Sequence, residues 1–241
     1  MITLTMLYNN IAHDHRLVTG WGLSCLIEGM EKTVLFDTGG DGEILIFNMR
    51  ILGKDPRTLD AVVLSHGHWD HTGGLGAFLH AGGNGELYIP GSFPERFRKD
   101  AARAGLEIIA MDGPGEIAPG IFSTGEMGAG IKEQALVLNI SEGLIVITGC
   151  AHPGIVNMIR KVKEVFSRPV CLALGGFHLM GASERDAGNT IGKLRELDVR
   201  RIAPSHCTGE RPIEIFKQTW QDDFIDFGCG ATFRIDNESA S

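Results

Sequence analysis

Four potential metal ligands stand within six residues of the sequence: His66, His68, Asp70 and His71. The apolar run 61–64 leads directly into this cluster and predicts a short buried strand. Imidazole and carboxylate groups crowded at the end of a buried strand are costly unless they are solvated or bind a cation. We therefore expect this segment to form a metal site at a strand end, with a solvated histidine-rich loop as the alternative.

The spacing within the cluster suits one or two adjacent metal ions. In extended backbone, side chains two residues apart point the same way, so His66 and His68 can bind the same ion. A turn after them redirects Asp70 and His71 toward a second ion. Gly67 gives the backbone the freedom to bend between the first two ligands.

Two further histidines follow strand-like runs later in the chain. The run 145–148 is followed by small residues and then by His152, and the run 201–203 is followed shortly by His206. A strand that ends in such a turn presents a side chain well, so we predict His152 as third ligand of the first ion and His206 as a ligand of the second. A helix-capping role for the neighbourhood of His152 is the alternative.

Strand and helix patterns occur twice along the chain in a similar order. Short strand-like runs separated by glycines are followed by alternating helices and strands, and no linker rich in Pro and Ser divides the two halves. We therefore predict a single α/β (α+β) domain over residues 1–241, a four-layer αββα sandwich of two sheets with helices outside. The expected helices cover 41–52, 74–80, 94–104, 154–166, 184–197 and 212–219.

Charge and cysteine content exclude several classes of protein. The formal net charge is −8 and no block of Lys and Arg stands out, so a nucleic-acid partner is not expected. Five scattered cysteines without a CxxC pair argue against a disulfide framework and indicate a reducing compartment. With no basic N-terminal signal and no apolar run near about 20 residues, we expect a cytoplasmic protein without a membrane partner. The expected partner is a small-molecule substrate, and the sequence carries no signal for an oligomeric state.

The order of these motifs resembles a known family. Phe36-Asp37-Thr38-Gly39, the histidine cluster, His152 and His206 are similar to the metallo-β-lactamase superfamily over essentially the whole chain. The resemblance implies that His66, His68 and His152 hold one metal ion and that Asp70, His71 and His206 hold the other. It also implies that Asp37 orients a ligand imidazole without binding metal itself. Zn²⁺ is the first expectation for one or both ions, and nitrogen and oxygen ligands suit Fe and Mn as well.

Three segments resemble one branch of this superfamily more narrowly: 149–152, 175–179 and 205–209. That branch contains the 7,8-dihydropterin-6-ylmethyl-4-(β-D-ribofuranosyl)aminobenzene 5′-phosphate synthases. The fold and the metal chemistry are expected to carry over from such a resemblance. Substrates carry over less well, because function depends on the loops grafted onto a fold.

One departure from the superfamily pattern concerns the turn after the strand-like run 170–174. Many dinuclear members have an Asp there that bridges both metals, whereas this chain has Gly175-Gly176-Phe177-His178. His178 is therefore a candidate metal ligand, substrate contact or catalytic acid or base, with a structural histidine as the alternative. We predict Asp70 and His178 as the catalytic residues.

The predicted metal site favours hydrolysis of a small phosphorylated metabolite. A bound ion lowers the pKa of water from about 15.7 toward about 7, and Asp70 would help to orient that water, with His178 or His206 near the leaving group. One alternative, implied by the branch, is a transferase that joins a dihydropterin pyrophosphate to an arylamine. Another is a non-catalytic ligand-binding or redox protein on the same scaffold, although redox diiron relatives typically carry Glu in place of His68.

Other polar residues receive simpler interpretations. His13, Asp14 and His15 are predicted to form a solvated loop, and His80 to lie on a helix surface. Cys150 and Cys207 flank predicted ligands, but we interpret both as buried packing residues. The segment 126–134 is equally compatible with a mobile loop and with an ordinary surface turn.

Overall fold

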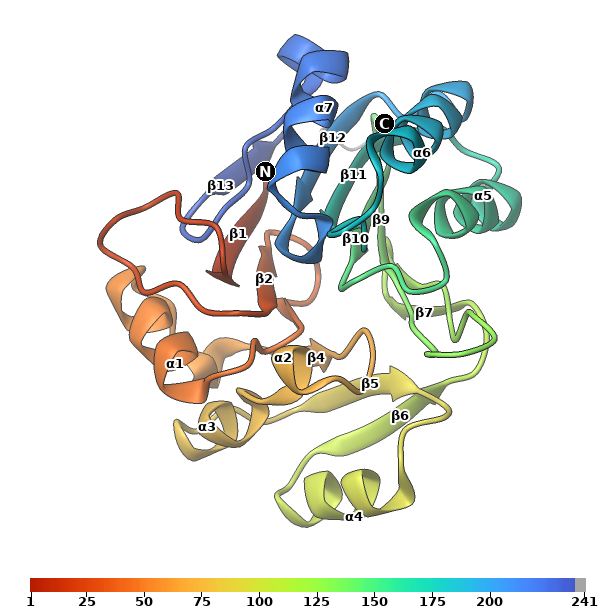
Figure 1. Cartoon of the computed structure of the whole chain (residues 1–241). Helices are drawn as coiled ribbons and strands as arrows, with labels where there is room; N and C mark the ends of the chain where they lie inside the picture. The colour runs from red at the N-terminus through yellow and green to blue at the C-terminus, as the bar shows by residue number, and fades with distance from the viewer. Residues whose placement is uncertain (237–241) are drawn as a thin grey trace.

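The computed structural model describes residues 1–236 and contains two β-sheets packed face to face, with helices outside (Figure 1). The first sheet has the spatial order β13-β1-β2-β3-β4-β5-β6. Its strands are β1 (Ile2–Asn9), β2 (Leu23–Glu28), β3 (Val34–Phe36), β4 (Ala61–Val63), β5 (Glu86–Pro90), β6 (Glu107–Met111) and β13 (Thr232–Ile235). Pairing is antiparallel from β13 to β3 and parallel from β3 to β6.

The second sheet has the spatial order β12-β11-β10-β9-β8-β7. Its strands are β7 (Gly115–Ala118), β8 (Ile121–Ser123), β9 (Leu136–Ile140), β10 (Gly143–Thr148), β11 (Val170–Gly176) and β12 (Arg201–Ser205). The strands β10, β11 and β12 are parallel to one another, and the remaining pairs are antiparallel. Both sheets therefore combine a parallel part with an antiparallel part.

Helices cover the outer face of each sheet. The first half contributes α1 (Gly42–Ile51), α2 (Trp69–Thr72), α3 (Leu75–His80) and α4 (Glu95–Arg103), and the second contributes α5 (Ile155–Phe166), α6 (Glu184–Glu196) and α7 (Glu210–Trp220). Three short 3₁₀ turns complete the described chain: η1 (Pro56–Thr58), η2 (His206–Thr208) and η3 (Gln221–Asp223). Helix α1 begins where the sequence predicts, because the Asp41 carboxylate caps the backbone N–H groups of Glu43 and Ile44.

Three apolar layers hold the sandwich together. The central layer lies between the sheets and includes Leu4 and Phe36 from the first sheet and Ile147 and Leu174 from the second. One outer layer joins α1, α3 and α4 to the first sheet, and the other joins α5, α6 and α7 to the second. Burying a large apolar side chain such as that of Phe36 stabilises a fold by about 1.5–3 kcal/mol. The predicted αββα sandwich is confirmed.

The sequence prediction missed four short elements. Strands β7 and β8 were missed because β7 carries the charged Glu116 and β8 is too short to show a periodic pattern. Strand β13 alternates polar and apolar residues within a polar tail, yet Ile235 is buried against β1. Helix α2 has a single turn and lies inside the histidine cluster itself. Such elements form because tertiary contacts stabilise them, and local propensity alone would not.

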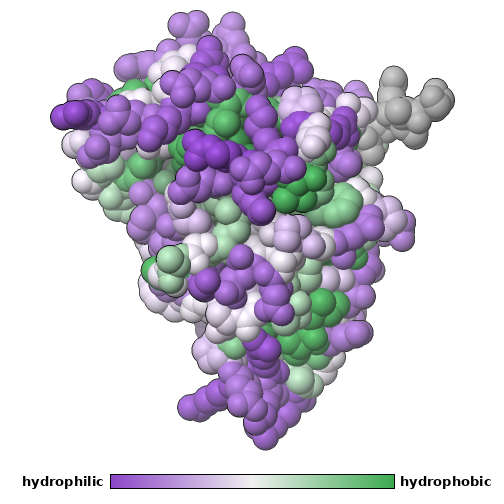
Figure 2. Space-filling model, turned by 90° about the vertical axis from the view of Figure 1, so that its right-hand side faces the viewer, coloured by the Kyte–Doolittle hydropathy of each residue, from purple (hydrophilic) through white to green (hydrophobic). Residues whose placement is uncertain are grey.

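Within residues 1–236, every helix is too short or too polar to cross a bilayer. Figure 2 shows a face that is mostly hydrophilic, with separate hydrophobic patches between the polar side chains.

The predicted site residues follow the ends of strands that lie near one another. Asp37 follows β3, His66 follows β4, and the turns after β10, β11 and β12 carry His152, His178 and His206. Carboxyl ends of neighbouring parallel strands meet at one edge of a sheet. The two sheets thus deliver residues distant in sequence to the same edge of the sandwich.

Candidate metal centre

Three imidazoles converge at the edge of the sandwich. The Nε2 atom of His66 lies 3.0 Å from Nδ1 of His68 and 3.2 Å from Nε2 of His152. His66 is fully buried, and the three donor atoms lie within 4.8 Å of one another. The structure thus brings together the three residues that the sequence predicts as ligands of the first ion.

A buried hydrogen-bond chain fixes which nitrogen of His66 faces this group. The Ser65 hydroxyl donates to Oδ2 of Asp37 at 2.7 Å, so its oxygen is left to accept from Nδ1–H of His66 at 2.9 Å. In this tautomer the His66 Nε2 atom carries no proton, and its lone pair is available to a metal ion. A carboxylate that holds an imidazole in one tautomer is a recurrent feature of metal sites.

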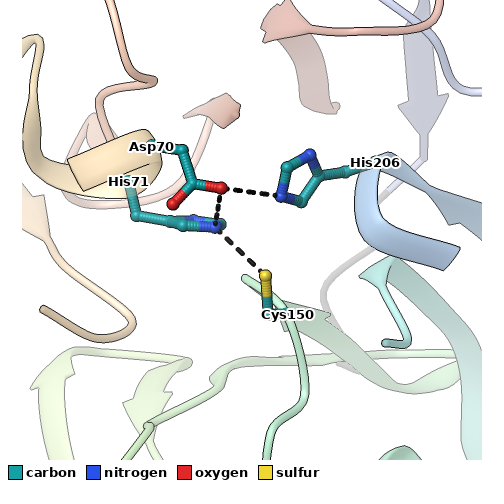
Figure 3. A group of neighbouring side chains, drawn as sticks. All are labelled: Asp70, His71, Cys150 and His206. Carbon is teal, nitrogen blue, oxygen red and sulfur yellow. Dashed lines mark hydrogen bonds and ion pairs between the residues drawn. The ribbon is translucent and has the colours of Figure 1, made fainter. Parts of the chain in front are cut away.

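The second group consists of Asp70 and His71 from α2, His206 from η2, and Cys150 from the turn after β10. Their side chains point toward one another from three separate segments (Figure 3). The Asp70 Oδ2 atom lies 3.3 Å from Nε2 of His206 and 3.6 Å from Nε2 of His71. The Cys150 Sγ atom lies 3.2 Å from Nε2 of His71. The three predicted ligands of the second ion are therefore adjacent, together with a thiol.

The hydrogen bonds around this group leave its donor atoms facing one another. The His71 Nδ1–H donates to Asp37 at 2.7 Å, and His206 Nδ1–H donates to the Asn10 amide oxygen at 2.9 Å. When both rings are neutral, their Nε2 atoms are lone-pair acceptors directed at the Asp70 carboxylate, which is also an acceptor. Within residues 1–236, Nε2 of His206 is the one buried side-chain nitrogen or oxygen atom without a hydrogen-bond partner. A cation between the two Nε2 atoms and the Asp70 carboxylate would give each of these acceptors a partner.

The two groups are neighbours and their backbone is strained. The rings of His66 and His71 have centroids 4.3 Å apart, so two ions bound by the groups would be adjacent. Four residues around them have positive φ although none is glycine: Asp37, Ala151, His178 and His206, at 58°, 58°, 52° and 51°. Such backbone angles cost about 1–3 kcal/mol each and cluster at functional sites.

Burial and neighbouring charges set the protonation of the histidines. Burial lowers the pKa of His66 well below its usual range, and the imidazole of His71 lowers it further. Burial, assisted by His178, lowers the pKa of His152 to about 4. Burial opposes protonation of His71 as well, but the carboxylates of Asp37, Asp70 and Glu133 together outweigh it and raise the pKa of His71. Neutral His66 and His152 keep the lone pairs that a metal ion requires.

Glu133 is a buried site residue that the sequence did not indicate. Its carboxylate accepts three backbone N–H bonds from the turn that carries His152: from Cys150 at 2.9 Å, Ala151 at 2.8 Å and His152 at 2.8 Å. Burial raises the pKa of Glu133 to about 7, and the three N–H groups oppose that rise. The Glu133 carboxylate thus gives three backbone N–H groups of the turn the hydrogen-bond partners that a helix or a sheet would otherwise supply.

Replacing Glu133 by glutamine is expected to lower the free energy of unfolding by about 1–3 kcal/mol, because an amide N–H₂ would face a backbone N–H donor in a buried site. Urea unfolding of the metal-free protein measures this loss. The matched control is Glu164→Gln, since Glu164 is exposed on α5. Equal stability of both variants would show that the Glu133 carboxylate does not hold the turn.

Other residues singled out in the sequence occupy simpler positions. His13, His15 and His80 are exposed, and Asp14 pairs with Arg16 at 2.6 Å, as expected for a solvated loop and a helix surface. The segment 126–134 is neither a free loop nor a plain surface turn, because Glu133 and Gln134 at its end are fully buried.

His178 lies beside the first group, Cys150 belongs to the second group, and Cys207 lies against the turn that carries Cys150. His178 is exposed, and its ring centroid lies 4.4 Å from that of His152. Cys150 and Cys207 are both buried, as predicted for packing residues, but the contact of Cys150 with His71 was not foreseen. The neighbouring Cys150 thiol, assisted by the His178 imidazole, lowers the pKa of the Cys207 thiol.

The family model of the metallo-beta-lactamase superfamily matches residues 22–206. The chain belongs to the metallo-β-lactamase superfamily. The match spans every predicted metal ligand, from His66 to His206, and the αββα sandwich agrees with it.

Relatives within the superfamily carry different activities. The chain is 31% identical to the 7,8-dihydropterin-6-methyl-4-(beta-D-ribofuranosyl)-aminobenzene-5′-phosphate synthase of Methanocaldococcus jannaschii, over 89% of this chain and 90% of that protein. A metal-dependent hydrolase of the beta-lactamase superfamily has a solved structure with 25% identity and a TM-score of 0.82, covering 98% of this chain and 99% of that one. A diphosphatase of the PhnP family has the same fold at 14% identity and a TM-score of 0.62, covering 98% and 99%.

Proposed function

We propose that this metallo-β-lactamase-fold protein is a metal-dependent hydrolase of a small phosphorylated metabolite. The observation that carries the proposal is the convergence of two adjacent donor groups, in which hydrogen bonds to Ser65, Asp37 and Asn10 occupy the Nδ1 atoms of His66, His71 and His206 and leave their Nε2 atoms facing the donor groups. We propose His66, His68 and His152 as ligands of one ion and Asp70, His71 and His206 as ligands of the other. Zn²⁺ is the ion first expected, and Fe or Mn also suits most of these donors.

Divalent ions in these groups would supply Lewis-acid chemistry, polarising a phosphoryl or carbonyl group and lowering the pKa of water. The protein supplies orientation and proton handling. Asp70 lies between His71 and His206, where its carboxylate can accept a hydrogen bond from the attacking water. His178 is exposed beside His152, where its imidazole can donate a proton to the leaving group.

A cavity next to the metal centre favours an anionic substrate. It measures about 320 Å³ and is lined by His152 and His178 together with Arg160 from α5 and Lys193 from α6. Arg and Lys side chains bind phosphate through charge-assisted hydrogen bonds. Two cations at the rim of a cavity in a protein of net charge −8 support a phosphorylated substrate.

A transferase is the second candidate, favoured by the 31% identity with the Methanocaldococcus jannaschii synthase. In that reaction class an arylamine would displace pyrophosphate from a dihydropterin, and the same centre would stabilise the departing anion. Pyrophosphate release distinguishes the hydrolase from the transferase, because only the transferase requires an added arylamine for it.

Purified protein loaded with Zn²⁺ or Mn²⁺ is expected to release phosphate from a panel of phosphate esters and to lose this activity on chelation. Restored metal is expected to restore the activity. Arg160→Ala is expected to raise KM about 10-fold with little change in kcat, because it removes a charged hydrogen bond worth about 1.4 kcal/mol. The matched control is Arg103→Ala, since Arg103 is exposed on α4.

Three results would count against hydrolysis. Activity that persists in the presence of chelators would show that the reaction does not depend on the metal centre. Pyrophosphate release that depends on an added arylamine would favour the transferase. Equal KM values for Arg160→Ala and Arg103→Ala would show that the cavity does not bind the phosphate.

A further inference from the structure

The C-terminal end of β11 has no room for the carboxylate that many dinuclear relatives place in this region. A Cβ atom added to Gly176 would lie 2.3 Å from the Gly149 carbonyl oxygen and 2.6 Å from Sγ of Cys207. A Cβ atom on Gly175 would lie 2.0 Å from the Thr148 carbonyl oxygen. The turn after β10 therefore occupies the space that an acidic side chain would need.

That same turn places a thiol in the second donor group. The Cys150 side chain is 4% exposed, and its Sγ lies 3.2 Å from the bare Nε2 of His71. Its Sγ and the donor atoms of Asp70, His71 and His206 all lie within 4.8 Å of one another (Figure 3). No other element of the described chain brings a fourth donor to these three residues.

The separations are within a few tenths of an ångström of those between ligands of one tetrahedral ion. Bonds of about 2.0 Å to nitrogen or oxygen and about 2.3 Å to sulfur place pairs of donors roughly 3.3–3.6 Å apart. The corresponding separations here are 3.3 Å for Asp70 with His206, 3.6 Å for Asp70 with His71 and 3.2 Å for Cys150 with His71.

We propose that Cys150 is the fourth protein ligand of the second ion, in the place of the missing carboxylate. This inference rests on the metal centre proposed above. Binding replaces the Cys150 S–H bond with a metal–sulfur bond and releases one proton to solvent. A thiolate among these donors favours Zn²⁺, Co²⁺ and Fe²⁺ at this position over Mn²⁺, which prefers oxygen ligands.

Cys207 is the matched control for Cys150. It is buried to the same degree, at 5% exposure, and lies against the same turn, where its Sγ is 3.6 Å from the Cys150 carbonyl oxygen. Its sulfur does not belong to the second donor group. Replacing either thiol by serine changes one buried atom in the same neighbourhood, so folding effects are comparable.

The test uses full-length protein loaded with Co²⁺, whose bond to a thiolate gives a strong near-ultraviolet charge-transfer band. The band is expected in the wild type and in Cys207→Ser, and is expected to be absent from Cys150→Ser. In Zn²⁺-loaded wild type, X-ray absorption is expected to show one Zn–S distance of about 2.3 Å. This second measurement needs no variant, so it decides the proposal even when Cys150→Ser does not fold.

Two cobalt ions bound without a charge-transfer band, or a band that persists in Cys150→Ser, would overturn the assignment of Cys150 and leave the metal centre standing. Wild-type protein that binds no cobalt and no zinc would overturn both proposals. The two failures are therefore distinguishable by metal content.

Discussion

Replacing His66 by alanine is expected to reduce the bound metal from about two ions per chain to about one, and His206→Ala is expected to do the same by emptying the other group. Each substitution removes one imidazole ligand from its own group, whereas the other group keeps all of its donors. Elemental analysis of the purified variants measures this directly, with His80→Ala as the control because His80 is exposed on α3. Hydrolysis is expected to fall to background in both ligand variants.

Other stoichiometries would change the proposal in defined ways. About one ion in the wild type, lost only in His66→Ala, would mean a mononuclear site and would assign His178 and His206 to substrate handling. Metal contents of zero in all proteins would favour the alternative of a non-catalytic ligand-binding protein on the same scaffold.

Asp37→Ala is expected to lower the free energy of unfolding by about 3–5 kcal/mol and the metal affinity by about 10–100-fold. The Asp37 carboxylate is fully buried and accepts from Ser65 N at 2.6 Å, Ser65 Oγ at 2.7 Å and His71 Nδ1 at 2.7 Å. Without it, three buried donors lose their partner, and the tautomers of His66 and His71 are no longer held. Urea unfolding and chelator competition give the two quantities.

The control for this prediction is Asp222→Ala, because Asp222 is exposed in η3. Asp37→Asn separates size from charge, since the amide keeps one acceptor oxygen but adds a donor. If Asp37→Ala kept both stability and metal affinity, the hydrogen-bond chain through Ser65 could not be what orients the ligands.

The sequence predicts the strand ends that carry the proposed ligands, but it does not predict the hydrogen bonds that orient their side chains. A buried apolar run followed by His66, or by small residues and His152, signals a side chain presented at a sheet edge. The structure places these residues together, and their role as ligands stays a prediction. Which nitrogen of each imidazole faces inward depends on Asp37 and Asn10, which lie far from the histidines in sequence, and no local pattern encodes that pairing.

Glu133 and Cys150 illustrate the same limit. Glu133 sits in a glycine-rich, charged segment that predicts exposure, yet the fold buries its carboxylate against the backbone of another turn. Cys150 has the composition of a packing residue, and only the approach of α2 from the other half of the molecule brings His71 to its sulfur. In both cases the role of the side chain depends on a residue from a distant segment of the chain, and the local sequence does not indicate that contact.

The pairing of β13 with β1 has a consequence for how a cell must make this protein. Strand β1 is synthesised long before its outer partner, which follows only with residues 232–235. At about 5–20 residues per second, the nascent chain carries an unpaired strand edge for roughly 10–50 s. Free strand edges recruit other chains, so this edge needs protection until residues 232–235 have been synthesised and can pair with β1.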